Sequence, residues 1–179
     1  MSKVILDLAM SLDGYVAGVH DEIDWLADFD PNDYGFPEFI KTVGAIVMGK
    51  RSYDIGIEQG WFKNNAYGTS PIFVVSKDIP KIVSDDARFY FVSDIQSAYE
   101  KAQATAGNKN IYLFGGASIF QQFLNAGLID EIHIGIVATI LGKGIRLFDN
   151  LADKRVRLER TKVVEYPKGL TGINYRIIK

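Results

Sequence analysis

The sequence predicts an α/β fold with a mixed, mostly parallel sheet that ends in an antiparallel hairpin. Along residues 4–138, short apolar runs alternate with amphipathic segments, the pattern of parallel strands joined by helices. Two later runs, 156–166 and 173–178, show rough apolar alternation and are separated by a Pro-Lys-Gly turn, as in a hairpin. With 179 residues and 47% hydrophobic content, the chain can bury a full core, and we expect one globular domain, residues 1–179.

Local patterns place the elements in order. β-branched and aromatic runs flanked by turn residues predict strands, and apolar residues at helical spacing predict helices. The predicted strands are residues 4–10, 45–48, 71–76, 88–92, 111–114 and 129–138. The predicted helices are residues 37–43, a helix from the N-cap Asp94 to about Ala106, and residues 118–126. Residues 11–31 are rich in Asp and Gly, so we expect a loop there.

Charge and composition argue against several classes of function. A formal net charge of −2 and a pI near 5.7 argue against bulk electrostatic binding to nucleic acid or to an anionic membrane. The absence of cysteine excludes disulfides and thiolate catalysis, and two histidines are few for a metal site, so we expect no metal. The N-terminal apolar run is interrupted by Asp7 and is too short for a signal peptide or a membrane span. We therefore expect a cytoplasmic protein.

The most informative segment, residues 110–120, is an apolar run that meets Gly115 and Gly116 and turns at once into an amphipathic pattern. Paired glycines leave no side chain between the backbone and a ligand, and the free amides at a helix start attract anions. Residues 45–53 repeat this plan, with Gly49 followed by a basic pair and a hydroxyl. Two such turns predict a nucleotide with more than one phosphate group. An ordinary tight turn is the alternative interpretation of the glycine pair.

Five segments of the chain resemble, in the same order, the motifs of the dihydrofolate reductase-like fold. They are residues 9–18, 24–26, 47–53, 74–77 and 113–120. Within that group the chain is most similar to bacterial proteins grouped with the reductase domain of riboflavin biosynthesis, and the resemblance covers nearly the whole chain. It implies a three-layer α/β/α domain that binds NADPH, as in reductases of 5-amino-6-(5-phosphoribosylamino)uracil or of dihydrofolate.

The resemblance also implies roles for individual residues in binding NADPH. The paired-glycine turn would bind the pyrophosphate and its ribose, the turn after Gly49 would bind the phosphates of the adenosine half, and Ser76 and Lys77 would lie beside the 2′-phosphate. The nicotinamide would pack against the first strand and the loop that follows it. The implied cofactor-binding residues are Ala9, Val16, Ala17, Gly49, Lys50, Arg51, Ser52, Val75, Ser76, Lys77, Phe114, Gly115, Gly116, Ala117, Ser118, Ile119 and Phe120.

The cations near these turns favour NADPH over NADH on physical grounds as well. A 2′-phosphate adds a dianion that clustered Lys, Arg and hydroxyl donors can offset, and such residues follow two separate strands. Lys50 and Arg51 can also be interpreted as a solvated helix start. Cations at a helix N-terminus oppose the macrodipole, however, so a bound anion explains them better. The Rossmann fingerprint G-x-G-x-x-G with a downstream acid is absent.

The substrate half of the predicted site rests on acidic and aromatic residues. In the folate-reducing branch of this fold, one carboxylate near the helix after the first loop assists protonation and binds the substrate ring. The candidates here are Asp28, Asp30, Asp33 and Glu38, and we take Asp33 and Asp28 as the catalytic pair to test. A solvated acid is the alternative interpretation of each. The residues expected to bind substrate are Asp13, Asp24, Trp25 and Tyr53.

Other residues receive structural interpretations or none. His133 lies in a predicted strand with no partner carboxylate at a fixed spacing, so we interpret it as a structural or surface residue. His20 is assigned no role. The aromatic residues of 61–68 either close over a flat substrate or pack in the core or a subunit contact, and residues 141–148 resemble a family loop that ends near the binding cleft.

The sequence thus carries two functional hypotheses. The first is an NADPH-dependent reductase that transfers a hydride to a small heteroaromatic compound, such as a pterin, a folate or a pyrimidine. The alternative is a module on the same fold that binds NADP(H) or a partner without turnover. A proton donor beside the nicotinamide distinguishes the two. We expect a homodimer that acts on a small molecule, with neither nucleic acid nor membrane as partner.

Overall fold

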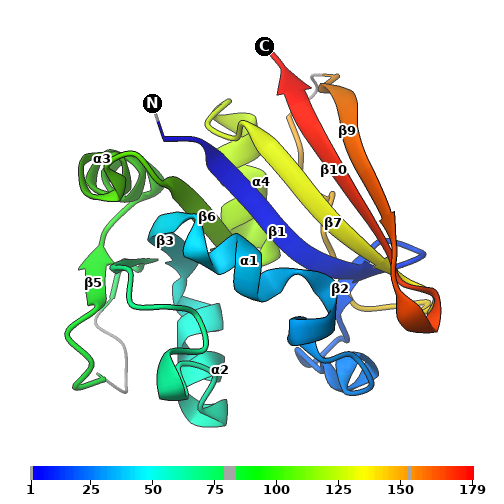
Figure 1. The fold of residues 1–179 in the computed structure, drawn as a ribbon. Helices are drawn as coiled ribbons and strands as arrows, with labels where there is room; N and C mark the ends of the chain where they lie inside the picture. Colours follow the sequence, from blue (N-terminus) through cyan, green and yellow to red (C-terminus); the bar gives the residue numbers. More distant parts are fainter. Residues whose placement is uncertain (1, 79–83, 153–154) are drawn as a thin grey trace.

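The computed structural model describes residues 2–78, 84–152 and 155–179, apart from the side chain of Asp33. Its main sheet has eight strands. They are β1 (Val4–Ser11), β3 (Val43–Gly49), β4 (Ile72–Val75), β5 (Phe89–Val92), β6 (Asn110–Gly115), β7 (Glu131–Val137), β9 (Arg157–Glu165) and β10 (Thr171–Ile178). Their order across the sheet is β5-β4-β3-β6-β1-β7-β10-β9 (Figure 1). The first six strands are parallel and the last two antiparallel, which confirms the predicted sheet.

Helices follow the strands as the sequence predicts, with shifts of a few residues at their ends. They are α1 (Phe36–Lys41), α2 (Lys50–Gln59), α3 (Ile95–Ala106) and α4 (Ala117–Asn125). The predicted helix over residues 37–43 runs too far, because Val43 is already the first residue of β3. Asp94 is the N-cap of α3, and its carboxylate accepts a hydrogen bond of 2.8 Å from the Ser97 amide.

The prediction of a loop over residues 11–31 is wrong in part. The segment contains the strand β2 (Tyr15–Ala17) and the short 3-10 helices η1 (Asp24–Leu26) and η2, which begins at Pro31 and ends at Tyr34. Strand β2 pairs with β8 (Ile145–Arg146), more than a hundred residues away, in a second, two-stranded sheet. A pairing of two such short strands has no local pattern, because each is defined only by its partner.

The sheet separates two apolar layers, so that the fold has three layers (Figure 1). Helices α3 and α4 cover one face with buried side chains such as Ala102 and Phe123. Helices α1 and α2 cover the other face, where Tyr53 of α2 and the half-buried Phe39 of α1 pack over β3 and β6. Alternate residues of each strand point to opposite faces, so β1 sends Leu6 toward α4 and leaves its odd-numbered side chains on the α1 face.

The described residues include no helix that is both long enough and apolar enough to span a membrane. The longest, α3, has 12 residues, whereas a span needs about 20.

Truncation of α4 in the core tests the packing of this layer. Phe123 is fully buried between α4 and the sheet. We expect Phe123→Ala to lower the free energy of unfolding by about 3–5 kcal/mol, because it removes apolar contacts and leaves a cavity. The neighbouring Gln122 is exposed, so Gln122→Ala should change stability by about 0.5 kcal/mol or less. Urea denaturation followed by circular dichroism measures both, and equal effects would contradict the assigned layer.

Candidate functional site

The two glycine turns predicted from the sequence lie against each other. Strands β3 and β6 are parallel neighbours, so the turns into α2 and α4 leave the same edge of the sheet. A Cβ added at Gly49 would lie 2.8 Å from Cγ1 of Ile119, and one added at Gly116 would lie 3.3 Å from Oγ of Ser52. Side chains at either glycine would therefore push the turns apart, which is the physical reason for glycine here.

Both helices that follow these turns begin without a side-chain cap. Helix α2 starts after Gly49 and helix α4 after Gly116, and neither glycine has a side chain that could accept a hydrogen bond from the first amides. Gly115 has a φ of 105°, a conformation that side chains disfavour, and its peptide bond to Gly116 is cis. Two positive helix ends are thus brought to one edge of the sheet, where an anion would offset them.

The cations of the β3–α2 turn already have carboxylate partners. Lys50 Nζ lies 2.5 Å from Asp54 Oδ2 within α2. Arg51 binds Asp21, with Nε and Nη2 at 2.8 and 2.5 Å from one carboxylate oxygen, although 69% of its side chain is exposed. These ion pairs offset part of the conflict with the helix dipole that the sequence shows. An incoming phosphate would compete with Asp21 for Arg51.

The segment after β4 joins the same edge of the sheet. Val75, the last residue of β4, is paired with Gly49 of β3. Ser76 is half-buried and its hydroxyl donates a hydrogen bond to the carbonyl oxygen of Asp78, while Lys77 is exposed. The structure therefore places the end of β4 beside the β3–α2 turn.

The remaining predicted cofactor residues divide into exposed and buried ones. Ser118 is exposed on the first turn of α4. Phe120 is fully buried in the core, so a ligand at this turn would meet its backbone only. Ala17 of β2 is buried and Val16 half-buried. Ala117 and Ile119 are also buried, and Phe114 is half-buried, its ring 5.1 Å from that of Tyr67 between centroids.

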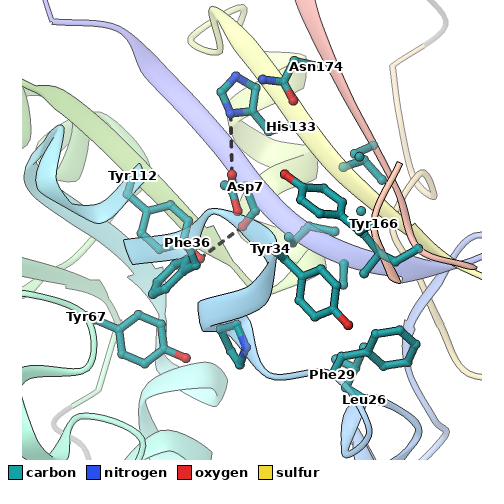
Figure 2. Close-up of a pocket in the computed structure, with 17 residues that line it drawn as sticks. Asp7, Leu26, Phe29, Tyr34, Phe36, Tyr67, Tyr112, His133, Tyr166 and Asn174 are labelled. Carbon is teal, nitrogen blue, oxygen red and sulfur yellow. Dashed lines mark hydrogen bonds and ion pairs between the residues drawn. The ribbon is translucent and has the colours of Figure 1, made fainter. Parts of the chain in front are cut away.

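A cavity of about 310 Å³ opens on the α1 face of the sheet, between that face and the segment from η1 to α1 (Figure 2). Ala9, at the β1 end nearest the glycine turns, lies in its wall. Strands β1, β7 and β10 form the floor, and the cover is mainly aromatic. The lining residues are Asp7, Leu8, Ala9, Leu26, Phe29, Pro31, Tyr34, Phe36, Tyr67, Tyr112, His133, Ile134, Gly135, Tyr166, Leu170, Gly172 and Asn174.

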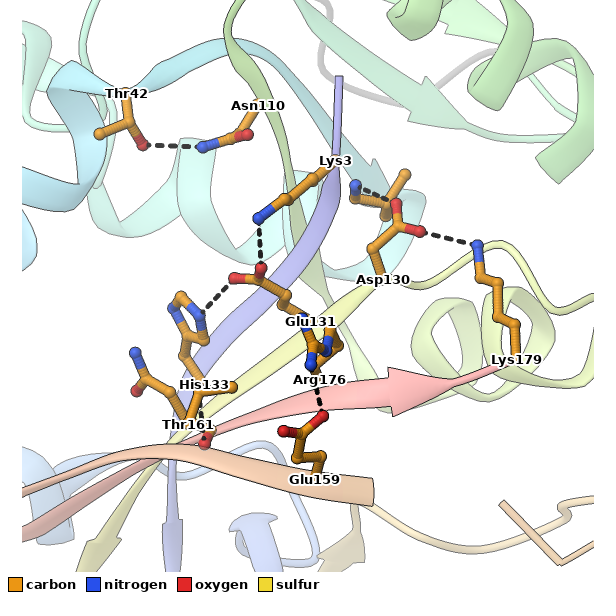
Figure 3. Close-up of polar contacts among 12 residues, drawn as sticks. Lys3, Thr42, Asn110, Asp130, Glu131, His133, Glu159, Thr161, Arg176 and Lys179 are labelled. Carbon is orange, nitrogen blue, oxygen red and sulfur yellow. Dashed lines mark hydrogen bonds and ion pairs between the residues drawn. The ribbon is translucent and has the colours of Figure 1, made fainter. Parts of the chain in front are cut away.

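A chain of polar side chains begins at the floor of this cavity and leads away from it. Asp7 and His133 are paired residues of β1 and β7, and Asp7 Oδ2 lies 3.5 Å from His133 Nδ1. The other ring nitrogen, Nε2, lies 3.2 Å from Glu131 Oε2, and Glu131 in turn binds Lys3 at 2.6 Å (Figures 2 and 3). Burial opposes ionisation of Glu131, but the hydrogen bonds from Lys3 and His133 outweigh it and lower the pKa of Glu131.

Two phenols of the cavity are held in their neutral form. Burial, with a smaller contribution from the Asp7 charge, raises the pKa of Tyr112 well above its ordinary value. Its hydroxyl donates a hydrogen bond of 3.1 Å to the carbonyl oxygen of Asp7. Burial also raises the pKa of Tyr67. These rings therefore contribute apolar faces and hydroxyl donors to the cavity, not negative charge.

Three of the acids proposed from the sequence, Asp28, Asp30 and Glu38, do not belong to the described lining of the cavity. The exposed Asp28 offers its carbonyl oxygen to Lys168 Nζ at the surface. Asp30 caps η2 through the Asn32 amide, and Glu38 pairs with a lysine on α1. Asp33 lies in η2, and its side chain is outside the described part of the chain. Within the described residues, the carboxylate that lines the cavity is Asp7.

The predicted substrate-binding residues are scattered. Trp25 is half-buried in η1, its Nε1 is buried without a hydrogen-bond partner among the described residues, and its neighbour Leu26 lines the cavity. Asp24 is exposed. Tyr53 is fully buried in the α2 layer, where its hydroxyl accepts a hydrogen bond of 2.9 Å from the Ser84 amide. Neither Asp24 nor Tyr53 belongs to the cavity lining in the described structure.

Asp13 also lies outside the described cavity lining, and its hydrogen bonds hold the 141–148 loop in place. Its carboxylate accepts hydrogen bonds from Ser11 Oγ at 2.7 Å, from the Gly142 amide at 2.7 Å and from the Leu141 amide at 3.1 Å. The bond from Ser11, opposed by partial desolvation and reinforced by the two amides, lowers the pKa of Asp13 from 3.8 to about 2. The 141–148 loop is thus tied to the β1–β2 turn.

Sequence reasoning missed Asp7 and the carboxylate neighbours of His133. Asp7 is the one acid inside the apolar run of β1, and that interruption was the available signal. Asp7 reaches His133 from the neighbouring parallel strand, so sequence spacing could not reveal the pair. The second neighbour, Glu131, lies two residues before His133 in β7.

Comparisons with known proteins agree with this architecture. A family model described as the RibD C-terminal domain matches residues 2–171. YyaP of Bacillus subtilis (strain 168) is 30% identical over 187 residues, covering 97% of this chain and 94% of YyaP. A crystal structure named "Putative riboflavin biosynthesis protein", from Shewanella sp. PV-4, covers 100% of both chains at 26% identity with a TM-score of 0.83.

The fold extends to dihydrofolate reductase. The Enterococcus faecalis enzyme, solved in complex with NADP(H), is 15% identical, covers 99% of this chain and 97% of its own, and has a TM-score of 0.70. The predicted dihydrofolate reductase-like fold is confirmed, and its reductase-type architecture is shared with these proteins.

The low pKa of Asp13 predicts how its replacement changes stability with pH. A carboxyl whose pKa is lower in the folded state stabilises that state above its unfolded pKa, near 3.8, and this contribution is lost as the pH falls toward about 2. We expect Asp13→Asn to have a lower melting temperature than the wild type at pH 6, with a difference that shrinks between pH 4 and about 2. The exposed Asp85→Asn serves as control, and a pH-independent difference for Asp13→Asn would contradict the assignment.

Proposed function

We propose that this chain, which belongs to the RibD C-terminal domain family, is an NADPH-dependent reductase of a small heteroaromatic compound. The observation that carries the proposal is the junction at Ala9 of β1. On one side of this strand lie the paired glycine turns with their uncapped helices, and on the other lies the aromatic cavity. A dinucleotide held at the turns would thus extend its nicotinamide toward a flat acceptor in the cavity.

The choice of NADPH rests on the cations beside the turns. Arg51, Lys50 and Lys77 follow β3 and β4, which end side by side. A 2′-phosphate there would replace Asp21 as the partner of Arg51, and the dianion would gain the charge-assisted hydrogen bonds that Arg51 now makes with one carboxylate oxygen. The NADP(H) complex of the Enterococcus faecalis reductase shows that a protein of this fold binds the same cofactor class.

Within this proposal, the protein positions the reactants and supplies a proton. NADPH supplies the hydride when it is bound. The aromatic cover excludes water from the acceptor, and Asp7 and His133 are the titratable pair at the cavity floor from which a proton can reach the substrate. His133 is connected through Glu131 and Lys3 to the exposed end of β1, which gives the proton a route from solvent.

Oxidation of NADPH by the purified protein tests the proposal. We expect the absorbance of NADPH to fall in the presence of at least one member of a panel of pterins, dihydrofolate and aminouracil precursors of riboflavin. Asp7→Asn should lower the turnover of that acceptor by about 10-fold to 1,000-fold, whereas the exposed Glu100→Gln on α3 should leave it unchanged. Tight NADPH binding without reduction of any acceptor would favour the alternative of a binding module.

Arg51 tests the cofactor preference directly. We expect Arg51→Ala to weaken NADPH binding by about 10-fold to 100-fold, because a charge-assisted contact is lost, and to leave NADH binding nearly unchanged. Calorimetric titration of both dinucleotides measures the two affinities, with the exposed Lys101→Ala on α3 as control. An equal loss for both dinucleotides would place Arg51 at the pyrophosphate instead.

A further inference from the structure

The described lining of the cavity contains no lysine and no arginine. Its charged and titratable members at the floor are Asp7 and His133. His133 does not substitute for a cationic clamp, because each ring nitrogen already faces a carboxylate, Asp7 at 3.5 Å and Glu131 at 3.2 Å. Even a protonated His133 would have its charge offset by these two neighbours. A phosphate inside the cavity would therefore meet Asp7 without any compensating cation.

The covering segment adds further negative charge at the entrance. Residues 21–33 supply Leu26, Phe29 and Pro31 to the cavity lining. The same short segment carries six acidic residues and no lysine or arginine. They are Asp21, Glu22, Asp24, Asp28, Asp30 and Asp33. Asp21 is paired with Arg51 beside the β3–α2 turn, so the repulsion at the entrance is attributed to the exposed Asp24, Asp28 and Asp30. A phosphate projecting from a bound heterocycle toward this segment would be repelled there as well.

One lysine does approach the entrance from the β9–β10 connection. Lys168 Nζ donates a hydrogen bond to the carbonyl oxygen of Asp28 and lies 6.0 Å from the centroid of the Phe29 ring. It is therefore held on the covering segment by a backbone oxygen, and its single positive charge is outnumbered by the exposed acids Asp24, Asp28 and Asp30 of that segment. Lys168 therefore does not make the net charge at the entrance of the cavity positive.

We propose that this cavity selects a flat heterocycle that carries no phosphate, is neutral or cationic, and turns an N–H edge toward Asp7. The inference rests on the proposed reductase function and narrows its substrate class. It separates this chain from reductases of phosphoribosylated aminouracils, one of the two activities that the sequence resemblance implies.

The shape and donors of the cavity fit such a ligand. Asp7 presents Oδ2 to His133, and among the described contacts its Oδ1 has no partner, so it can accept hydrogen bonds from ring or amino N–H groups. Phe36 and Tyr112 supply aromatic faces, with ring centroids 6.3 Å apart. Asn174, paired with His133 across β10 and β7, adds an amide that can donate or accept at the same end. This end of the cavity therefore recognises polar edges of an uncharged ring.

Calorimetric titration with matched pairs of ligands tests the proposal on the intact protein. The pairs are 6-hydroxymethylpterin with its phosphate ester, and uridine with uridine 5′-monophosphate. We expect the unphosphorylated member of at least one pair to bind about 10-fold more tightly than its phosphate, with a gap that narrows as salt is raised. Asp7→Asn should weaken the unphosphorylated member by about 10-fold, because it exchanges a charged acceptor for a neutral amide.

Substitutions of acids on the covering segment, residues 21–33, distinguish the effect of charge on binding from the effect of cavity shape. In the double variant Asp24→Asn and Asp28→Asn, we expect the affinity of the phosphorylated member relative to that of the unphosphorylated member to rise by about threefold. Glu100→Gln on α3 should alter neither affinity. Melting curves of all variants confirm that each is folded.

Two outcomes overturn the proposal: equal or tighter binding of the phosphorylated members, and no binding of any unphosphorylated member. NADPH is titrated into the same samples without the heterocycles. Retained NADPH binding together with either outcome would refute the substrate class while leaving the reductase function standing. A protein that binds neither NADPH nor any of the heterocycles would refute the reductase function itself.

Discussion

The central position of β1 is the constraint on which the rest of the structure depends. It pairs in parallel with β6 on one side and with β7 on the other, so one strand borders the paired glycine turns and also forms the cavity floor. Its alternation turns Leu6 into the α4 layer and Asp7 and Ala9 toward the cavity. A shift of one residue in register would exchange these faces and destroy both the core and the site at once.

The strands and helices could be predicted from sequence because they obey local rules. The apolar run ending at Gly49 and the run ending at Gly115 each fix a strand, a turn and a helix within about fifteen residues. What local rules could not supply were pairings between distant segments. Strand β2 is defined only by its pairing with β8. The carboxylate of Asp7 could be recognised as a site residue only from its contact with His133 in the neighbouring strand.

The candidate site residues also divide into those that local rules could predict and those that depend on distant contacts. The positions of the glycine turns followed from backbone requirements, which a sequence displays directly as glycine. The acids of residues 21–33 could not be ranked as catalytic candidates, because the sequence does not show which carboxylates are exposed and which face a cavity. Asp13 shows the difficulty. It precedes Gly14 in a turn and was expected to bind substrate, yet its hydrogen bonds from the amides of Leu141 and Gly142 hold two loops together.

The distribution of charge follows from these placements and separates two tasks. Cations gather at the ends of β3 and β4, where Arg51 is paired with Asp21, whereas Asp7 is the carboxylate in the described lining of the cavity and the exposed Asp24, Asp28 and Asp30 lie on the segment that covers it. If both proposals hold, a cofactor rich in phosphates and a substrate with none would bind adjacent regions without exchanging places. The sign of the charge on each side of Ala9 would then favour a different ligand, because like charges repel a phosphate at the cavity and the cations attract it at the turns.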